Sequence, residues 1–511
     1  MSDGIFVGGG GAGYAEAEQL LLKFGNRHGL IAGATGTGKS VTLQILAEGL
    51  SDAGVPVFLA DVKGDLAGLA LSGSDSFKLH DAFMKRAATI GYSDYHYRAF
   101  PVTFWDLYGQ QGHPIRTTVS EMGPLMLSRM LDLSEAQEGA MNIAFRLSDE
   151  EQLPLLDLKD LQALLVFIGE NADKIGLRYG NVEKSTIGAI QRRLLVLENQ
   201  GGTLLFGEPA LELADLMQVD PDGRGRINIL AADKLMGAPK LYATFLLWLL
   251  SELFEELPEV GNPDKPKLVF FFDEAHLLFD DAPKALVDKV EQVARLIRSK
   301  GVGVYFISQN PADVPDDILG QLGNRVQHAL RAFTAKDRKE LRMAAQNYRD
   351  NPRFSIEDAI KEVGTGEAVT SFLEDKGIPS VAERTLIRPP ASHLGAITPA
   401  QRAAVIAASP LVGKYETVID RDSAFERLQK RAEAAAKEAE KAAAPEEEAA
   451  DEGFTSARRY DPKAATKPRR AAASRSDSVT TAFAKSFARQ LGSRSGRALV
   501  RGILGSLFKA R

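Results

Sequence analysis

The chain has 511 residues, of which 44% are hydrophobic and 25% are charged, so it can bury a large core and hold two or three domains. It contains no cysteine, which excludes disulfides and thiolate metal sites. The first residues, MSDGIFVGGG, lack the basic and apolar regions of a signal peptide, and the most apolar stretch, 241–254, is too short to span a bilayer. We therefore expect a soluble cytoplasmic protein.

The net charge of −6 hides an asymmetry between the C-terminal tail and the rest of the chain. Residues 453–511 contain fourteen Lys and Arg against two acids, which gives this tail a charge of +12. Apolar stripes at 479–491 and 499–508 predict two short amphipathic helices. We expect the tail to meet nucleic acid, a membrane surface, a protein partner or the acidic body itself; a disordered solubilising tail is the alternative.

Near the N-terminus, GGGGAG (residues 8–13) formally satisfies the dinucleotide-binding pattern G-x-G-x-x-G. No convincing strand–helix–strand unit follows it, and the phosphate-binding motif described next comes too soon for a dinucleotide half-domain. We therefore interpret this stretch as a flexible N-terminal segment.

Residues 33–40, GATGTGKS, match the Walker A motif G-x-x-x-x-G-K-[ST] at every fixed position, between a strand-like and a helical segment. The backbone N–H groups of such a loop and the start of the following helix bind phosphate oxygens. Lys39 would reach the β- and γ-phosphates of ATP, and the Ser40 hydroxyl would help to hold Mg²⁺. The predicted nucleotide-binding residues are Gly33, Thr35, Gly36, Thr37, Gly38, Lys39, Ser40 and Val41.

Nearly continuous apolar runs predict strands that are buried on both faces. These runs are HGLIAGAT, VPVFLAD, RINILAA, KLVFFFDE and GVGVYFIS. Helical patterns at 39–51, 238–257 and 283–299 lie between them. The alternation predicts an α/β fold with a mainly parallel sheet covered by helices.

Polar residues end three of these runs, where parallel strands line a ligand crevice. Asp273 is placed to hold Mg²⁺ through water, and Glu274 to polarise the attacking water as a general base. If the strand 301–308 lies between the other two, Gln309 would sense the γ-phosphate or orient the water. Asp61 is a further candidate member of the site, although it could simply end its strand.

The letters DEAH at 273–276 also spell the signature of a large helicase group. A helicase of that group carries a second RecA-like domain that supplies an arginine to the same ATP. Only about 200 residues follow Gln309, and roughly the last 90 are linker and tail. We therefore interpret the string as an ordinary acidic strand end, with His276 in a structural or coupling role.

At these residues the chain resembles the HerA/FtsK superfamily of ring ATPases, and most closely the HerA-like family typified by YjgR. The resemblance covers about residues 5–410 and rests on motifs in the family's order. They are GATGTGKS, ADVKGDL, FFFDEAHLLF, RLIRSKGVGVYFISQNPADVP and GTGEAVTSFLEDKGIPSVAERTLIRPPAS. The resemblance implies a RecA-like core with additional strands, ATP hydrolysis with Mg²⁺, and hexameric rings that pump DNA in relatives.

The resemblance also implies an arginine that reaches into the neighbouring subunit's site. Arg298, in RLIRSKG, holds the matching position, and Arg325, in LGNRVQHAL, is a second candidate. HerA proteins place a β-barrel before the phosphate loop, whereas only 32 residues precede Gly33 here. We therefore expect the ATPase machinery without that barrel.

We expect residues 1–74 and 225–410 to form the ATPase core and 75–224 a mostly helical insertion. Residues 411–452 would be a charged helical linker, solvated or disordered, and 453–511 the basic tail. The resulting hypothesis is an ATP-hydrolysing ring motor, a DNA translocase or helicase-like ATPase that works as a homo-oligomer. The alternatives are a ring ATPase that drives protein transport or remodelling, and a nucleotide-dependent scaffold.

Overall fold

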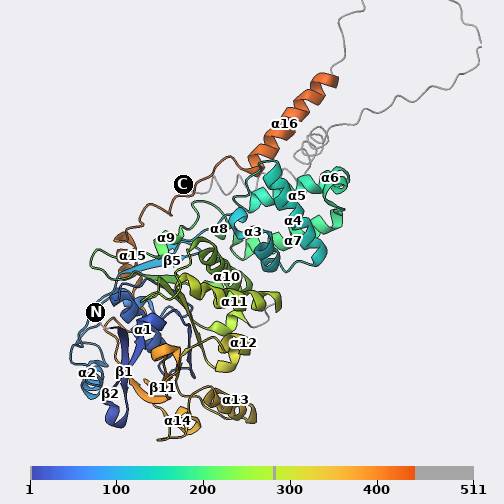
Figure 1. The fold of residues 1–511 in the computed structure, drawn as a ribbon. Helices are drawn as coiled ribbons and strands as arrows, with labels where there is room; N and C mark the ends of the chain where they lie inside the picture. The colour runs from blue at the N-terminus through green and yellow to red at the C-terminus, as the bar shows by residue number, and fades with distance from the viewer. Residues whose placement is uncertain (1–2, 280–283, 444–511) are drawn as a thin grey trace, which may run out of the picture. The chain divides into compact units, whose positions relative to one another are not determined.

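The computed structural model describes residues 3–279 and 284–443, which form two compact units (Figure 1). The first unit comprises residues 1–132 and 196–420. The second comprises residues 133–195 and, of the described residues, 421–443. The predicted basic tail, 453–511, lies outside the described residues.

The described residues of the first unit form one 12-stranded sheet in the order β2-β1-β12-β11-β10-β3-β9-β8-β4-β7-β5-β6. The strands are β1 Gly4–Gly10, β2 Glu16–Leu21, β3 Gly29–Ala32, β4 Val57–Asp61, β5 Val102–Asp106, β6 His113–Pro114, β7 Ile227–Ala231, β8 Leu268–Phe272, β9 Val302–Ser308, β10 Asn324–Gln327, β11 Glu367–Ser371 and β12 Glu383–Ile387. Neighbouring strands from β10 to β6 run parallel, whereas β11, β12, β1 and β2 join antiparallel. The predicted mainly parallel sheet is confirmed.

The helices of the first unit are α1 Lys39–Asp52, α2 His80–Thr89, α3 Val119–Met130, α8 Gly202–Leu205, α9 Leu213–Leu216, α10 Pro239–Glu256, α11 Lys284–Ile297, α12 Asp316–Leu319, α13 Ala335–Gln346, α14 Ile356–Glu362 and α15 Pro399–Ala407. None of the described helices is long and apolar enough to cross a membrane.

The five predicted strands are β3, β4, β7, β8 and β9, and all their residues are buried. Alternate side chains point to opposite faces of the sheet. On one face, Leu59 and Phe271 join a cluster with Leu43 and Leu46 of α1. On the other face, rings stack across β4, β8 and β9, as Phe58 does on Phe270. Burial on both sides explains why these strands are continuous apolar runs.

The glycine-rich N-terminus is not the flexible segment that we expect from the sequence. Residues 4–10 form β1, which pairs with β2 and with β12. A Cβ on Gly8 would lie 2.2 Å from the Leu386 carbonyl oxygen, so only glycine allows this approach. The expectation is wrong because we took the glycines as a sign of freedom, whereas they permit close packing between strands.

The segment that we expect to be mostly helical, 75–224, also supplies two strands of the sheet. β5 pairs with β7 and carries β6 on its outer edge. Trp105 on β5 is fully buried and donates from its indole nitrogen to Asn228 at 3.0 Å. Part of this segment therefore belongs to the core of the first unit.

In the second unit, the helices are α4 Glu135–Glu150, α5 Leu158–Glu170, α6 Ala172–Tyr179, most of α7 Lys184–Asn199, and α16 Ala424–Ala443. α16 packs against α5 and buries Leu428, Ala432 and Ala435. The Asp160 carboxylate of α5 accepts from the Ser423 hydroxyl at 2.5 Å, just before α16 begins. The helix that we expect to be solvated therefore belongs to a small core, because alanine allows close contact between helices.

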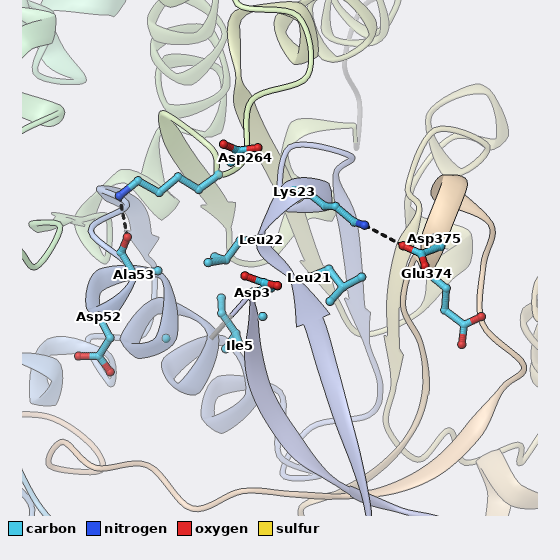
Figure 2. Close-up of a pocket in the computed structure, with 13 residues that line it drawn as sticks. Asp3, Ile5, Leu21, Leu22, Lys23, Asp52, Ala53, Asp264, Glu374 and Asp375 are labelled. Carbon is cyan, nitrogen blue, oxygen red and sulfur yellow. Dashed lines mark hydrogen bonds and ion pairs between the residues drawn. The ribbon is translucent and has the colours of Figure 1, made fainter. Parts of the chain in front are cut away.

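A cavity of about 1000 Å³ lies at the amino ends of the parallel strands (Figure 2). Lys23, Ala53 and Lys265 line it, and these residues precede β3, β4 and β8. Both lysines are tied to its wall: Lys23 pairs with Asp375 at 2.8 Å, and Lys265 donates to the Ala53 carbonyl at 2.8 Å. Asp61, Asp273, Glu274 and Gln309 lie at the opposite, carboxyl ends of the strands.

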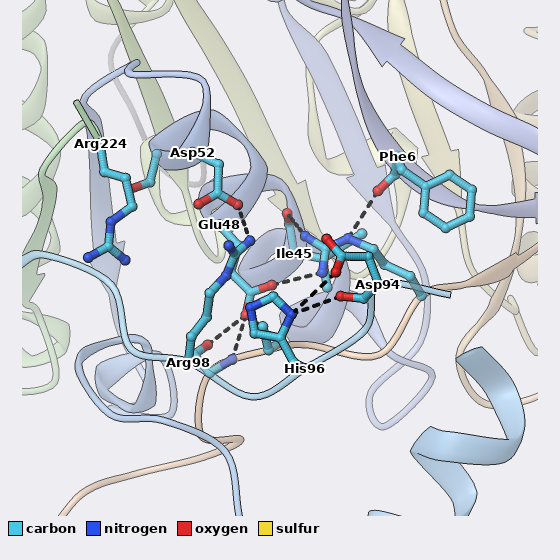
Figure 3. A network of polar contacts seen from close by, with 12 residues as sticks. Phe6, Ile45, Glu48, Asp52, Asp94, His96, Arg98 and Arg224 are labelled. Atoms are coloured by element: carbon cyan, nitrogen blue, oxygen red, sulfur yellow. Dashed lines mark hydrogen bonds and ion pairs between the residues drawn. The ribbon is translucent and has the colours of Figure 1, made fainter. Parts of the chain in front are cut away.

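A buried ion pair fixes α1 to the segment after β12 (Figure 3). Glu48 Oε2 accepts from Arg388 at 2.9 Å, and Oε1 accepts from the Ala391 and Ser392 N–H groups at 2.9 Å and the Ser392 hydroxyl at 2.7 Å. Arg388 also donates to the Phe6 and Ile45 carbonyls. We call the contacts of Glu48 with residues 388–392 the α1 clamp; it holds the helix that follows the phosphate loop.

Candidate nucleotide-binding site

The phosphate loop, residues 33–38, connects β3 to α1 in a conformation that favours glycine. Gly33, Gly36 and Gly38 have φ angles of 152°, 77° and 121°. A side chain at Gly33 would also collide with His328, whose Cβ would be 2.5 Å away. The loop therefore leads directly into the N-terminus of α1, whose free N–H groups suit an anion.

The predicted contact residues of the loop differ in accessibility. Thr35 and Gly36 are exposed, and Ser40 and Val41 are half-buried in the first turn of α1. Thr37 is buried, and its hydroxyl donates to a loop carbonyl at 2.7 Å. Thr37 thus stabilises the loop from within, while Thr35, Gly36 and Ser40 remain within reach of a ligand.

Lys39 is buried inside the loop that it follows. Its ammonium donates to the Gly33 carbonyl at 2.6 Å and to the Ala34 carbonyl at 3.2 Å. Burial lowers the pKa of Lys39, and the nearby Lys63 ammonium lowers it further. A positive charge confined in this way has a strong preference for an anion at the loop.

Asp61 ends β4, Asp273 and Glu274 follow β8, and Gln309 follows β9, which lies between β3 and β8. This order satisfies the condition that we set for Gln309. Its Nε2 donates to Glu274 Oε2 at 3.4 Å, so the ends of β8 and β9 are joined. Ser308, the last residue of β9, donates its hydroxyl to Asp313.

Glu274 is held in place by three side chains and an unusual backbone conformation. Its φ of 49° lies in the left-handed region that non-glycine residues seldom adopt. Oε1 pairs with Lys63 at 2.5 Å, and Oε2 lies 3.3 Å from His276 Nδ1. Burial alone would raise the pKa of Glu274, but the hydrogen bond and charge of Lys63 lower it. The carboxylate is therefore ionised at neutral pH.

Asp273 and Asp61 are buried carboxylates whose pKa values are raised, unlike that of Glu274. Burial raises the pKa of Asp273 to about 6 and that of Asp61 to about 7, and the Asp65 charge raises the latter further. Asp61 accepts from the Gly64 and Leu66 N–H groups at 2.7 and 3.2 Å. Raised values mean that the site disfavours these negative charges unless a cation is near.

The buried Tyr242 hydroxyl of α10 has no hydrogen-bond partner among the described residues. Burial raises its pKa, as do the charges of Asp273, Asp61 and Glu274. Within the described ranges, no group of three or more His, Cys, Asp or Glu side chains could hold a metal alone. The Asp273 and Asp61 carboxylates and the Ser40 hydroxyl are oxygen ligands of the kind that Mg²⁺ accepts, and phosphate and water oxygens would complete its coordination.

His328 is a site residue that sequence reasoning missed. It follows β10, is fully buried, and its Nδ1 lies 3.0 Å from the Glu367 carbonyl oxygen. Nδ1 must donate there, so Nε2 accepts from the Thr42 hydroxyl at 2.8 Å. Burial lowers the pKa of His328 to about 4, which keeps the ring neutral. No signal in the single sequence connects it to the phosphate loop.

The family model for the helicase HerA-like C-terminal region matches residues 12–511. The chain belongs to this family. The match confirms the resemblance drawn from the motifs. Among curated proteins, the chain is 23% identical over 357 residues to the DNA double-strand break repair helicase HerA of Sulfolobus acidocaldarius, covering 67% of this chain and 62% of the relative. It thus spans less than two thirds of that relative's length.

The chain is also similar to two solved structures. VirB4 of Thermoanaerobacter pseudethanolicus is 15% identical, with a TM-score of 0.47 and coverage of 76% of this chain and 96% of that one. The plasmid coupling protein TrwB in complex with ADP and Mg²⁺ is 18% identical, with a TM-score of 0.43 and coverage of 73% and 89%.

Within this HerA-like fold, the two candidate arginines lie in different settings. Arg298 precedes β9, so the length of that strand, roughly 23 Å, separates it from Gln309. Its side chain is half-exposed; burial lowers its pKa, and so does the neighbouring Arg27. Arg325 instead donates to the carbonyls of Leu319, Leu322 and Asn347 at 2.8 to 3.1 Å. Neither guanidinium is brought to Glu274 of its own chain.

Proposed function

We propose that this HerA-like chain hydrolyses ATP as part of a ring-shaped motor that moves DNA. The observation that carries the proposal is the arrangement of Lys39, Asp273, Glu274 and Gln309 on neighbouring strand ends. A phosphate loop beside an ionised carboxylate and a carboxylate suited to a cation is the machinery of phosphoryl transfer to water.

In this proposal the phosphate loop binds the β- and γ-phosphates through its N–H groups and Lys39. Ser40 and Asp273 are the residues that would hold Mg²⁺, which neutralises phosphate charge when bound. Glu274 accepts a proton from the attacking water, and Gln309 orients that water. Asp61 supports Asp273 from the end of β4 as a second acceptor.

Lys63 is a further member of the proposed site. Its ammonium pairs with Glu274 and lies close enough to Lys39 and Asp273 to affect their pKa values. It therefore keeps the base ionised while holding it beside Gln309. Lys63 lies in the ADVKGDL motif, to which we assigned only Asp61 from the sequence.

The test is the variant Glu274→Gln, which retains the shape of the side chain but cannot accept a proton. We expect ATP to bind normally and turnover to fall by ~10²-fold or more. The matched control is Glu255→Gln on the exposed side of α10, which should hydrolyse ATP at the normal rate. Wild-type turnover in Glu274→Gln would contradict the assignment of the base.

The distance of Arg298 from its own site supports action across a subunit boundary, in a homo-oligomer that we propose is a hexamer. An arginine supplied by a neighbour can contribute ~10³-fold in rate. We expect Arg298→Ala to be inactive alone and to regain partial turnover when mixed with Glu274→Gln, because mixed interfaces contain one intact site. Full activity of a monomer on light scattering would contradict this. Arg325 is the weaker candidate, because its guanidinium is occupied by three carbonyls.

DNA is the favoured polymer because the curated relative is a DNA repair helicase. The alternative, a ring ATPase for protein transport or remodelling, predicts turnover that DNA does not affect. ATPase rates with and without single- and double-stranded DNA, over a salt series, separate the two, because phosphate contacts weaken as salt rises. We place the motor in the cytoplasm. The chain has no cysteine and therefore no disulfide that would require an oxidising compartment.

A further inference from the structure

The exposed side chains of residues 331–349 combine an aromatic ring with positive charge. Phe333, in the loop before α13, is 80% exposed and is the one aromatic among the exposed large apolar side chains of the described residues. The same segment contains six Lys and Arg but only two acids. This concentration of cations stands out in a chain whose net charge is −6.

The cations of α13 share the side of the helix that faces away from the core. Leu341 and Ala344 are buried, whereas the opposite side of the helix is exposed. That exposed side carries Lys336, Arg338, Lys339 and Arg342. We call these four side chains, together with Phe333, the α13 face.

Both acids of the segment are engaged within the fold. Asp337 closes the N-terminal cap of α13 by accepting from the backbone N–H groups of Phe333 and Thr334 at 2.9 Å. Glu340 accepts from the Asn310 side chain. By contrast, the Arg338 and Lys339 side chains form no hydrogen bond or ion pair with the described residues. Their charge is therefore available to a polyanion.

The α13 face is also connected to the proposed catalytic residues. Asn310, which contacts Glu340, follows Gln309 directly, and Gln309 contacts Glu274. Lys336 lies 3.6 Å from Glu340. One cation of the α13 face therefore contacts the residue that binds Asn310. A cavity of about 310 Å³ between α13 and residues 311–319 leaves room for the helix to shift.

We propose that the α13 face binds single-stranded nucleic acid. The four cations contact successive phosphates, and a base stacks on Phe333. Stacking requires an unpaired base, which a duplex does not offer, and it is tolerant of sequence. Binding is transmitted through Glu340 and Asn310 to Gln309. The inference rests on the proposed function. It adds that the nucleic acid is bound at the α13 face and that it is bound there as a single strand.

The first experiment measures binding of fluorescein-labelled oligothymidine to the full chain with a non-hydrolysable ATP analogue over a salt series. The double variant Arg338→Glu/Lys339→Glu should bind at least tenfold more weakly and flatten the log–log salt dependence by about 1.4, which is two single-strand phosphate contacts. The control Lys78→Glu/Lys85→Glu makes the same charge change at exposed lysines in and before α2, and it should bind like wild type.

Phe333→Ala separates stacking from charge. It should weaken oligothymidine binding about tenfold, leave the salt dependence unchanged, and barely affect a blunt duplex of equal length. Equal losses for the single strand and the duplex, or no loss for either, would overturn the stacking assignment. An acidic peptide is the competitor that tests charge alone. If it displaces labelled oligothymidine as well as unlabelled oligothymidine does, and equally well from wild type and from Phe333→Ala, then the α13 face binds any polyanion and the proposal is contradicted.

A cross-link locates the contact independently of affinity. Oligothymidine that contains 5-iododeoxyuridine, irradiated on the wild-type chain, should attach to the peptide that contains Phe333; attachment only to residues 453–511 would overturn the inference. The α13 variants should keep DNA-free ATPase activity but lose its stimulation. If wild type hydrolyses ATP and responds to DNA while the α13 variants behave identically, this inference alone fails. If wild type does not respond to DNA at all, the proposed DNA motor fails with it.

Discussion

The α1 clamp and the nucleotide-binding site both bury carboxylates beside the same helix, but the protein treats these charges differently. Glu48 in the clamp receives four hydrogen bonds, one of them from the Arg388 guanidinium, so its charge is balanced within the fold. Asp273 and Asp61 are also buried, and burial raises their pKa values; among the described residues, no Lys or Arg forms an ion pair with either carboxylate. A buried carboxylate that is paired with an arginine, such as Glu48, contributes to the stability of the fold. Buried carboxylates without such a partner, such as Asp273 and Asp61, are typical of a site that binds a ligand.

The clamp should give the largest effect on stability. Arg388→Met removes the cation and leaves Glu48 buried and unpaired, so we expect the free energy of unfolding to fall by ~3–5 kcal/mol. Urea unfolding followed by tryptophan fluorescence measures this, because both tryptophans, Trp105 and Trp248, lie in the first unit.

Arg98 provides the control for the clamp, because it pairs with Asp52 where both side chains are about a third exposed (Figure 3). Arg98→Met should cost at most ~1 kcal/mol. If Arg388→Met costs no more than Arg98→Met, then the clamp is not a stabilising ion pair.

The second prediction concerns Asp273. Asp273→Asn should lower turnover by ~10²-fold or more, because the residue that would hold Mg²⁺ loses its charge. At pH 7.5 it should nevertheless not reduce the free energy of unfolding. The pKa of about 6 in the folded chain exceeds the ordinary 3.8, so ionisation opposes folding and an amide removes that cost. Destabilisation on the scale of the clamp would show that Asp273 is a structural carboxylate like Glu48.

Buried His328 should make an intermediate, pH-dependent contribution. Its pKa is about 4 in the folded chain and ordinarily 6.5, so the unfolded chain binds more protons between these values. The stability that His328 contributes is present above pH 6.5 and is lost as the pH falls toward 4. The difference in unfolding free energy between wild type and His328→Gln should shrink by roughly 1.4 kcal/mol per pH unit in that window.

The comparison with His328→Gln is needed because Asp61 and Asp273, with raised pKa values, act in the opposite direction as the pH falls. Their effect is the same in both proteins and cancels in the difference. A difference that does not change with pH would mean that His328 can be protonated in the folded state without cost.

The sequence predicted those parts of the molecule that depend on local pattern. The central strands are apolar runs, and the motif at 33–40 carries its own context, so both could be found without tertiary information. β1 could not, because the need for its glycines comes from close contacts with distant residues, as between Gly8 and Leu386. His328 and Lys63 were missed for the same reason: each acts through a partner that is distant in the sequence. Long-range contacts of this kind leave no periodic signal in one chain.

The smallest expected effect is that of Lys63 on the pH profile of ATP hydrolysis. It shows whether the Lys63 ammonium lowers the pKa of Glu274, the proposed base. Lys63→Met removes the charge that lowers the pKa of Glu274, so the pKa should rise. Asp273 should move in the same direction, because Lys63 also lowers its pKa. Since the proposed base, Glu274, can accept a proton only when it is ionised, the acid limb of kcat/KM should move up by about one pH unit.

At pH 8, where Glu274 is ionised in either protein, turnover of Lys63→Met should differ from wild type by less than about tenfold. Lys63→Arg should retain the wild-type limb, because a guanidinium carries the same charge. This separates charge from packing: a role in packing alone would alter turnover at every pH without moving the limb. An unmoved limb in Lys63→Met would mean that the 2.5 Å pair with Glu274 only holds the side chain in place, and that Glu274 owes its ionisation to Gln309 and His276.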